Sequence, residues 1–176
     1  LMANICADDY GLDSVSSRHI QQCIDRGQLN RVSVFPNFEE IDLSKIRNGK
    51  NVQIALHINL VEGKCLSAPN EITLLADKNG LLMHDFVGLL MISLLRPKAF
   101  KEQIYKEIKA QVLFWKSILP ADMPFCIDSH QHTHMIPPIF KMLLKVLNDE
   151  NISVEHMRIS AEPLLPYWFT SGSIPE

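Results

Sequence analysis

The chain has 176 residues, of which 47% are hydrophobic and 21% charged, and its formal net charge at pH 7 is -3. A chain of this length can bury one sizeable core, so residues 1–176 are expected to form a single domain. Acidic and basic residues are interleaved rather than gathered into blocks, which excludes the charge patterns of nucleic-acid-binding and membrane-surface proteins and favours a small-molecule partner.

The first half of the chain predicts alternating strands and helices. Short apolar runs of strand type are separated by segments of helical period, which is typical of an α/β fold with parallel strands. Gly27 stops the first helix, and Pro36 stops the second strand. The expected strands cover residues 3–7, 31–35 and 52–60, and the expected helices cover about residues 14–26 and 41–47.

The second half continues this alternation after a long loop. Residues 61–80 carry Gly, Pro and Asn with little periodicity, and loops of this kind often cover a functional site. The clearest helix runs from Phe100 to Leu119, where apolar residues recur every three or four positions. The other expected elements are a buried helix at residues 86–95, strands at 125–129 and 154–159, and a helix at 138–147.

The number of β/α units limits the architecture. Five units account for the chain up to about residue 160, whereas a closed eight-unit barrel needs about 250 residues. The fold is therefore expected to be either a short open sheet or a (β/α) barrel truncated at its C-terminus. The tail at residues 163–176 is rich in Pro, Gly and Ser and has no predicted element of its own, which favours truncation.

Nothing in the sequence predicts a membrane span or a secretion signal. The apolar stretch at residues 86–95 is much shorter than the roughly 20 residues that span a bilayer. The chain reaches Asp8 and Asp9 before a hydrophobic region of signal length could form. The four cysteines include no C-x-x-C pair, which favours reduced thiols. A cytoplasmic protein is therefore expected.

Side chains that can carry chemistry collect where the predicted strands end. The first strand ends at Asp8 and Asp9, the third carries His57, the fourth runs into His130, and the fifth carries Arg158. Catalytic groups of parallel α/β folds lie at the carboxyl ends of the strands. These side chains are therefore expected to meet at one rim of the sheet.

Two of these features are ambiguous when taken alone. Of two adjacent aspartates, one can bind a cation while the other accepts a proton from water. The pair could equally form a turn and cap before the first helix, although Asp13 or Ser14 could cap that helix instead. His57 lies in an apolar run, where a hydrogen-bonded core histidine is more common than a metal ligand.

The histidines His130, His132 and His134 indicate a metal site more strongly. If this segment is extended, its period of two puts all three imidazoles on one side, where they could bind a divalent transition metal. A solvated polar loop is the weaker alternative. Arg158 could bind a substrate anion or pair with a carboxylate of the site.

Three motifs follow one another along the chain: ADDYG at residues 7–11, LHINL at 56–60 and DSHQHTH at 128–134. In this order they resemble the YdjC-like carbohydrate deacetylases, the family that includes chitooligosaccharide deacetylase. The resemblance extends to about Glu162. It implies a (β/α)-barrel-like fold related to polysaccharide deacetylases, with a bound divalent cation.

The resemblance also implies roles for individual residues. Carried over position by position, it assigns the metal to Asp9, His57 and His130 and makes Asp8 the general base. Members of the family are usually longer, and their C-terminal part supplies further strands and a histidine thought to act as general acid.

The remaining histidines of the third motif receive supporting roles. His132 and His134 match the motif and would line the pocket or support the ligands, and either is a candidate for the acid that protonates the departing amine. Arg158 lies in a stretch that looks like the one following the family's histidine motif, and binding substrate or supporting the site is expected of it.

The expected activity is metal-dependent hydrolysis of N-acetyl groups on an amino sugar or a chitooligosaccharide-like substrate. The cation is expected to be magnesium or zinc, because histidines suit zinc whereas the family's usual assignment is magnesium. Two alternatives stay open, a metal-dependent phosphoesterase and a non-catalytic metal-binding or sugar-binding protein. The expected partner is a small carbohydrate, and the exposed edges of an incomplete barrel favour a homodimer.

Overall fold

The computed structural model describes residues 5–38, 41–47 and 52–159, so the predictions for residues 3–4 and for the tail at 163–176 lie outside the described residues. Within the described part of the chain, helices and strands alternate as expected. The elements are β1 (Cys6–Tyr10), α1 (Ser14–Asp25), β2 (Arg31–Val34), α2 (Leu43–Arg47), β3 (Gln53–Ile58), the 3-10 helix η1 (Pro69–Glu71), α3 (Phe86–Leu95), α4 (Pro97–Ile118), β4 (Cys126–Ser129), the 3-10 helix η2 (His130–Met135), α5 (Pro137–Asp149) and β5 (His156–Met157).

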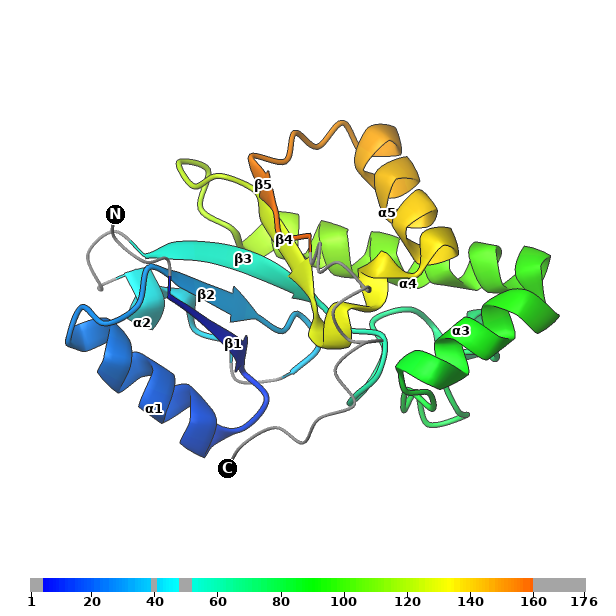
Figure 1. Cartoon of the computed structure of the whole chain (residues 1–176), viewed down its shortest axis with the longest axis horizontal. Coiled ribbons are helices and arrows are strands. Elements are labelled where there is room, and N and C mark those ends of the chain that lie inside the picture. The colour runs from blue at the N-terminus through cyan, green and yellow to red at the C-terminus, as the bar shows by residue number, and fades with distance from the viewer. Residues whose placement is uncertain (1–4, 39–40, 48–51, 160–176) are drawn as a thin grey trace, which may run out of the picture.

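The five strands form one parallel sheet in the order β1-β2-β3-β4-β5 (Figure 1). This confirms the predicted α/β fold with parallel strands. Each strand pairs with the next one in the chain, which is the order found in (β/α) barrels, whereas doubly wound folds reverse the order at a switch point. The fold is therefore a five-stranded α/β sheet of the kind that forms part of a (β/α) barrel.

One face of the sheet is apolar and carries the core. Paired residues of neighbouring strands point to the same face, and Val32, Ile54, Leu56 and Ile127 lie together on this one, all buried. Helix α4 packs on β3 and supplies the core with a stripe of apolar residues three or four positions apart. The buried residues of that stripe are Phe100, Ile104, Ile108, Val112 and Trp115.

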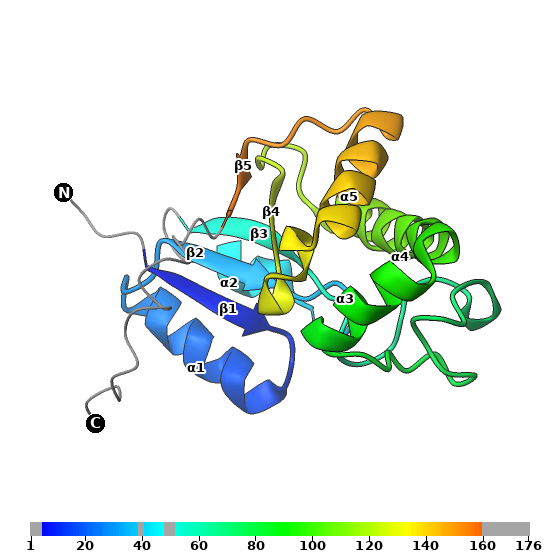
Figure 2. The ribbon, with the colours of Figure 1, turned by 45° about the vertical axis from the view of Figure 1, so that its right-hand side comes forward.

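The opposite face of the sheet is polar. Ser33, His57 and Asp128 lie on it, as the register places His57 beside Asp128. Figures 1 and 2 show α1 next to β1 and the α4–α5 pair next to β3 and β4. The strands therefore bury hydrophobic side chains on one face and hold chemically active side chains on the other.

The prediction of a buried helix at residues 86–95 is only partly correct. A helix does cover Phe86–Leu95, but it is not a buried helix, because Val87, Leu94 and Leu95 are 61%, 68% and 71% exposed. The apolar sequence of the segment could not distinguish a helix packed on all sides from one packed mainly against α4. Across the described ranges, no helix combines the length and hydropathy that a membrane crossing requires.

The strands at the two edges of the sheet also differ from prediction. β1 continues to Tyr10 instead of ending at Ala7, so Asp8 and Asp9 belong to the strand. β5 is only His156–Met157, shorter than the predicted strand at 154–159. The cap of α1 is Asp13, whose Oδ1 accepts hydrogen bonds from the backbone N–H groups of Val15 and Ser16, both at 2.8 Å. Asp8 and Asp9 are therefore free of the capping role.

Candidate metal centre

Asp9, His57 and His130 converge at the carboxyl ends of β1, β3 and β4. Asp9 Oδ1 lies 3.1 Å from His57 Nε2 and 2.9 Å from His130 Nδ1. One ligand atom from each residue lies within 4.8 Å of the other two. The two imidazole rings meet edge to face, with centroids 5.6 Å apart. Three stretches of chain that are distant in the sequence therefore form one potential metal-binding group.

The spacing and chemistry of these atoms fit a divalent cation. Two ligands bound at about 2.1 Å and at right angles to each other lie roughly 3.0 Å apart, which is close to both measured distances. Two imidazoles and one carboxylate form a ligand set that leaves coordination positions open for water or substrate. The three residues could therefore hold one divalent metal ion with space for a reactant.

An unusual backbone conformation directs Asp9 towards the histidines. Its φ angle is 64°, in the left-handed region that non-glycine residues rarely adopt but aspartate tolerates better than most. The pairing of β1 with β2 shifts register between Ala7 and Tyr10, on either side of this residue. Backbone conformations of this type cost on the order of 1–3 kcal/mol and are concentrated at functional sites. The adjacent carboxylates of Asp8 and Asp9 therefore contact different partners, with Asp9 facing the two histidines.

The electrostatics of this group favour an ionised Asp9. Hydrogen bonds from His130 and His57 hold the pKa of Asp9 well below its usual range. Burial alone would lower the pKa of His57, but the hydrogen bonds to Asp128 and Asp9 outweigh burial and raise this pKa to about 9. The hydrogen bond to Asp9 also raises the pKa of His130. The carboxylate of Asp9 thus favours the protonated form of both imidazoles.

Asp128 orients His57. Its Oδ1 lies 2.5 Å from His57 Nδ1, and its Oδ2 accepts a hydrogen bond from the hydroxyl of Ser33 at 2.5 Å. Asp128 is fully buried, so its charge must be satisfied by such partners. Because Asp128 accepts a hydrogen bond from the Nδ1–H group, Nε2 is directed at Asp9 and is available to a metal ion. Asp128 opens the third motif, but its role could not be predicted from the sequence.

Asp8 has a separate partner, Arg158. The guanidinium donates hydrogen bonds of 3.0 and 2.9 Å to the two oxygens of Asp8 and lies 3.3 Å from Asp128. Burial raises the pKa of Asp8, but the hydrogen bonds from Arg158 and Cys6 outweigh it and lower that pKa overall. Of the two roles open to Arg158, the structure thus shows pairing with carboxylates of the site.

Cys6 completes this second cluster. Its Sγ donates to Asp8 Oδ1 at 3.2 Å, and burial is the main reason that its pKa rises to about 11. Cys6, Asp8 and Asp128 also lie close enough to hold a metal ion. Arg158, however, already supplies the positive charge between the two carboxylates. This cluster is an ion-paired network rather than a second cation site.

Residues 130–134 are not extended, so the condition under which the three imidazoles would share one side is not met. They begin the 3-10 helix η2, and Gln131 and His132 have φ angles of 50° and 53°. The three histidines therefore point in different directions: His130 towards Asp9, His132 to solvent, and His134 into the interior. Only His130 of the three belongs to the metal-binding group. His132 makes no hydrogen bond or ion pair with any residue that the structure describes.

His134 joins η2 to the end of β4 and to the residue that follows β5. Its Nε2 donates to the carbonyl oxygen of Arg158 at 2.9 Å, so Nδ1 must accept the hydrogen bond from the Ser129 hydroxyl at 2.5 Å. Burial lowers the pKa of His134, which keeps the imidazole neutral. The residue is fully buried and both ring nitrogens are occupied. It therefore holds Arg158 in place and is not available to protonate a leaving group.

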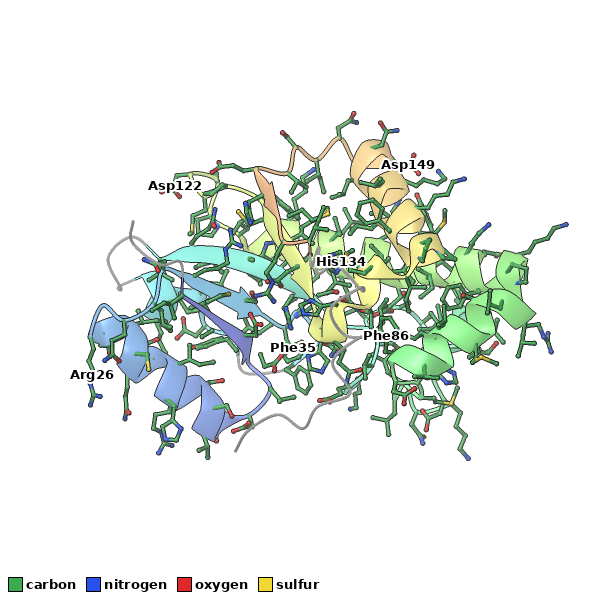
Figure 3. The ribbon with its side chains drawn as sticks, in the orientation of Figure 1. Arg26, Phe35, Phe86, Asp122, His134 and Asp149 are labelled. Carbon is green, nitrogen blue, oxygen red and sulfur yellow. The ribbon has the colours of Figure 1, made fainter. Side chains whose placement is uncertain are left out.

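Phe35 packs against both metal-binding imidazoles. The centroid of its buried ring lies 5.0 Å from that of His57 and 5.1 Å from that of His130. Figure 3 labels Phe35 and His134 at the end of the sheet towards which the strands point. Phe35 was not among the site residues predicted from the sequence. Its position at the end of a predicted strand, directly before Pro36, was the available indication.

A groove of about 360 Å³ is lined mainly by residues of the loops that follow β1, β2 and β3. A larger cavity of about 630 Å³ lies against α1 and α2. Neither lining includes Asp9, His57 or His130, but the loops that line the smaller groove leave the strands at the same rim as the metal-binding group. The lining residues of the smaller groove are Gly11, Leu12, Asp13, Ser14, Asn37, Phe38, Gly63, Lys64 and Leu81.

Known proteins are similar to this chain in sequence and in fold. The sequence model of the YdjC-like protein family matches residues 3–171. A carbohydrate deacetylase from Danio rerio is 28% identical over 167 residues, which cover 93% of this chain and 51% of the relative, so the chain spans about half the length of that protein. A crystal structure of a candidate cellobiose-phosphate cleavage protein from Enterococcus faecalis matches with a TM-score of 0.69 and 22% identity, over 92% of this chain and 60% of that one. At this identity, the structural match shows the fold alone.

Proposed function

The chain belongs to the YdjC-like protein family, and on that premise we propose that it is a metal-dependent hydrolase that removes N-acetyl groups from an amino sugar. The observation that carries the proposal is the convergence of Asp9, His57 and His130 at one rim of the sheet. The name of the Danio rerio relative, carbohydrate deacetylase, supports the class of reaction and substrate.

The metal ligands in this proposal are Asp9 Oδ1, His57 Nε2 and His130 Nδ1. When bound, a divalent cation supplies Lewis acidity, which polarises an amide carbonyl and lowers the pKa of water. Two nitrogen ligands favour zinc or another first-row transition ion, whereas magnesium prefers oxygen ligands. Zinc is therefore the first ion to test and magnesium the second.

Asp8 is the proposed proton acceptor for the attacking water. Its lowered pKa keeps the carboxylate ionised at neutral pH, and Arg158 fixes its orientation through two hydrogen bonds. An ionised carboxylate is the form that can accept a proton from water, as a general base must. His132 is the candidate acid for the departing amine, because His134 is buried with both ring nitrogens hydrogen-bonded.

The groove lined by Asn37, Phe38 and Lys64 is the proposed binding site for the sugar. Its lining combines an aromatic ring with polar groups, which suits a carbohydrate because sugars present both apolar ring faces and hydroxyl groups. A small carbohydrate is therefore the proposed partner.

The contacts of Arg158 weigh against the phosphoesterase alternative. Such an enzyme would need two cations about 4 Å apart and a cationic clamp for phosphate. Within the described residues, the second acidic group is Cys6, Asp8 and Asp128, and Arg158 occupies it. The same ion pairs engage the guanidinium that would otherwise bind phosphate. One cation and amide chemistry are the simpler interpretation.

Acetate release tests this proposal. Metal-free protein is incubated with N-acetylglucosamine oligomers, with and without added zinc or magnesium, and the Danio rerio deacetylase serves as positive control. We expect acetate only when metal is present, and we expect none from the Asp9→Ala variant. Metal binding without acetate release would favour a non-catalytic binding protein, and hydrolysis of a phosphate ester instead would overturn the proposal.

A further inference from the structure

The two metal-binding histidines have different surroundings on the side away from Asp9. On His57, the far nitrogen Nδ1 contacts the buried carboxylate of Asp128. On His130, the far nitrogen is Nε2, which is buried and has no hydrogen-bond partner among the described residues. Its closest recorded charged contact is Glu62, whose Oε1 lies 3.5 Å away. A carboxylate therefore lies behind each imidazole, but only one is at hydrogen-bonding distance.

We propose that Glu62 is the positioning residue of the second ligand: its carboxylate accepts a hydrogen bond from the Nε2–H group of His130 when Nδ1 binds the metal ion. The inference rests on the proposed metal-dependent function and assigns to Glu62 the part that Asp128 has for His57.

The proton chemistry of imidazole requires such an acceptor. A neutral imidazole carries one proton, so a metal ion on Nδ1 obliges Nε2 to carry it. A buried N–H group without an acceptor is destabilising. Among the described residues, Glu62 supplies the one carboxylate recorded within 4.0 Å of Nε2, which has no hydrogen-bond partner. A shortening of this 3.5 Å contact would give a normal hydrogen bond.

The backbone of Glu62 is fixed on both sides. Asn59 Oδ1 accepts a hydrogen bond from the Glu62 N–H at 3.0 Å, and Asn59 Nδ2 donates to the Glu62 carbonyl at 2.7 Å. Asn37 Nδ2 donates to the same carbonyl at 2.9 Å. The main chain therefore cannot move freely, and only the side chain of Glu62 needs to rotate towards His130.

Helix α4 binds the loop that follows β3 through two buried side chains. Gln111 Oε1 accepts from the Asn59 N–H at 3.0 Å, and its amide donates to the Asn59 carbonyl at 2.5 Å. The fully buried Glu107 accepts the N–H groups of Leu66 and Ser67 at 3.0 and 2.9 Å. Buried polar groups of this kind specify one backbone arrangement. The loop after β3 is thus attached to the core at both ends of the segment that carries Glu62.

The exposure of Glu62 separates a positioning role from a packing role. Its side chain is 44% exposed. Truncating it should leave the fold intact, because substitutions of exposed side chains usually change stability little. An effect on metal binding would therefore reflect the lost contact with His130.

Metal titration of variants tests the inference. Zinc affinity is measured by calorimetric competition for the wild type, Glu62→Ala and Glu62→Gln, and the metal-free melting temperature is measured in parallel. We expect Glu62→Ala to weaken zinc binding roughly 10–100-fold, Glu62→Gln to weaken it less because its amide oxygen can still accept a hydrogen bond, and both to melt like the wild type. Glu71→Ala is the matched control, since Glu71 is an exposed glutamate that contacts Lys106 instead.

The outcomes separate this inference from the proposed function. Wild-type affinity in Glu62→Ala would overturn the inference and leave the metal site standing. A large loss of melting temperature in metal-free Glu62→Ala would overturn it as well, because the role would then be structural. Binding of neither zinc nor magnesium by the wild type would overturn both. In the zinc-loaded wild type, ¹⁵N-resolved NMR should show His130 protonated at Nε2, and a proton at Nδ1 would contradict the inference.

Discussion

His57 and Asp128 occupy paired positions on neighbouring parallel strands, and Nδ1 of the histidine lies 2.5 Å from Oδ1 of the aspartate. The register of β3 with β4 therefore decides which imidazole nitrogen faces the rim. Because Asp128 is fully buried and also bound by Ser33, it cannot turn away from His57. The strand pairing thus prepares one metal ligand before any metal ion binds.

Replacing Asp128 with Asn should weaken metal binding while retaining the shape of the side chain. The amide supports the required tautomer of His57 less strongly than a carboxylate, so we expect zinc affinity to fall roughly 10–100-fold. Calorimetric titration measures the change, and circular dichroism verifies the fold. Asp25→Asn, at an exposed position on α1, serves as control. Unchanged affinity would mean that Asp128 does not orient the ligand.

The stability of the metal-free protein should depend on pH through His57. Folding raises its pKa from the ordinary value of 6.5 to about 9, so the folded state favours the protonated form. The resulting stabilisation is complete below pH 6.5 and is lost as the pH rises through about 9. His130, whose pKa is also raised, acts in the same direction.

We therefore expect the melting temperature of metal-free protein to fall between pH 6.5 and pH 9. The His57→Gln variant should show a flatter dependence over the same interval, whatever its absolute stability. Scanning calorimetry in chelator-treated buffers measures both. A melting temperature that rises over this interval would contradict the contacts of His57 with Asp128 and Asp9.

Replacing Asp8 with Asn should separate catalysis from metal binding. Asp8 contacts Arg158 and Cys6 rather than the metal-binding histidines, so zinc affinity should change by less than about threefold. Deacetylation should fall by roughly 10²–10⁴-fold, the usual contribution of a general base. Asp9→Asn gives the opposite comparison, because it removes a ligand and should lose affinity. Retained turnover in Asp8→Asn would remove Asp8 from the base role.

Phe35→Ala should affect both stability and the site. The ring is fully buried and contacts the imidazoles of His57 and His130. Loss of a buried phenylalanine typically costs about 3–5 kcal/mol, and the vacated space should let both rings rotate. Urea unfolding and zinc titration measure the two effects. A stability loss below about 1 kcal/mol would show that the ring is not a fixed part of the packing.

Much of the fold could be predicted because its signals are local. The apolar repeat from Phe100 to Leu119 lies on one face of a helix, and α4 covers Pro97–Ile118. Parallel strands were predicted from apolar runs between helices, and all five were found. The ends of the edge strands were harder to predict, because each edge strand pairs with a single neighbour and that pairing sets its length. The two-residue β5 illustrates this.

The potential metal ligands were predictable, whereas their surroundings were not. Asp9, His57 and His130 stand in recognisable motifs, and the structure brings them together. Asp128, Phe35 and Glu62 act through contacts across strands and loops, which depend on register and on side-chain direction. The three histidines of residues 130–134 would share one side only in an extended segment, whereas the positive φ angles in η2 turn them apart, and no propensity in the sequence indicates that turn.

Anomalous X-ray diffraction from crystals grown with zinc tests the central claim most directly. The account predicts one strong anomalous peak about 2.0–2.2 Å from Asp9 Oδ1, His57 Nε2 and His130 Nδ1. A peak beside Cys6 and Asp8 instead, or a zinc-saturated crystal without density between the aspartate and the two imidazoles, would contradict it.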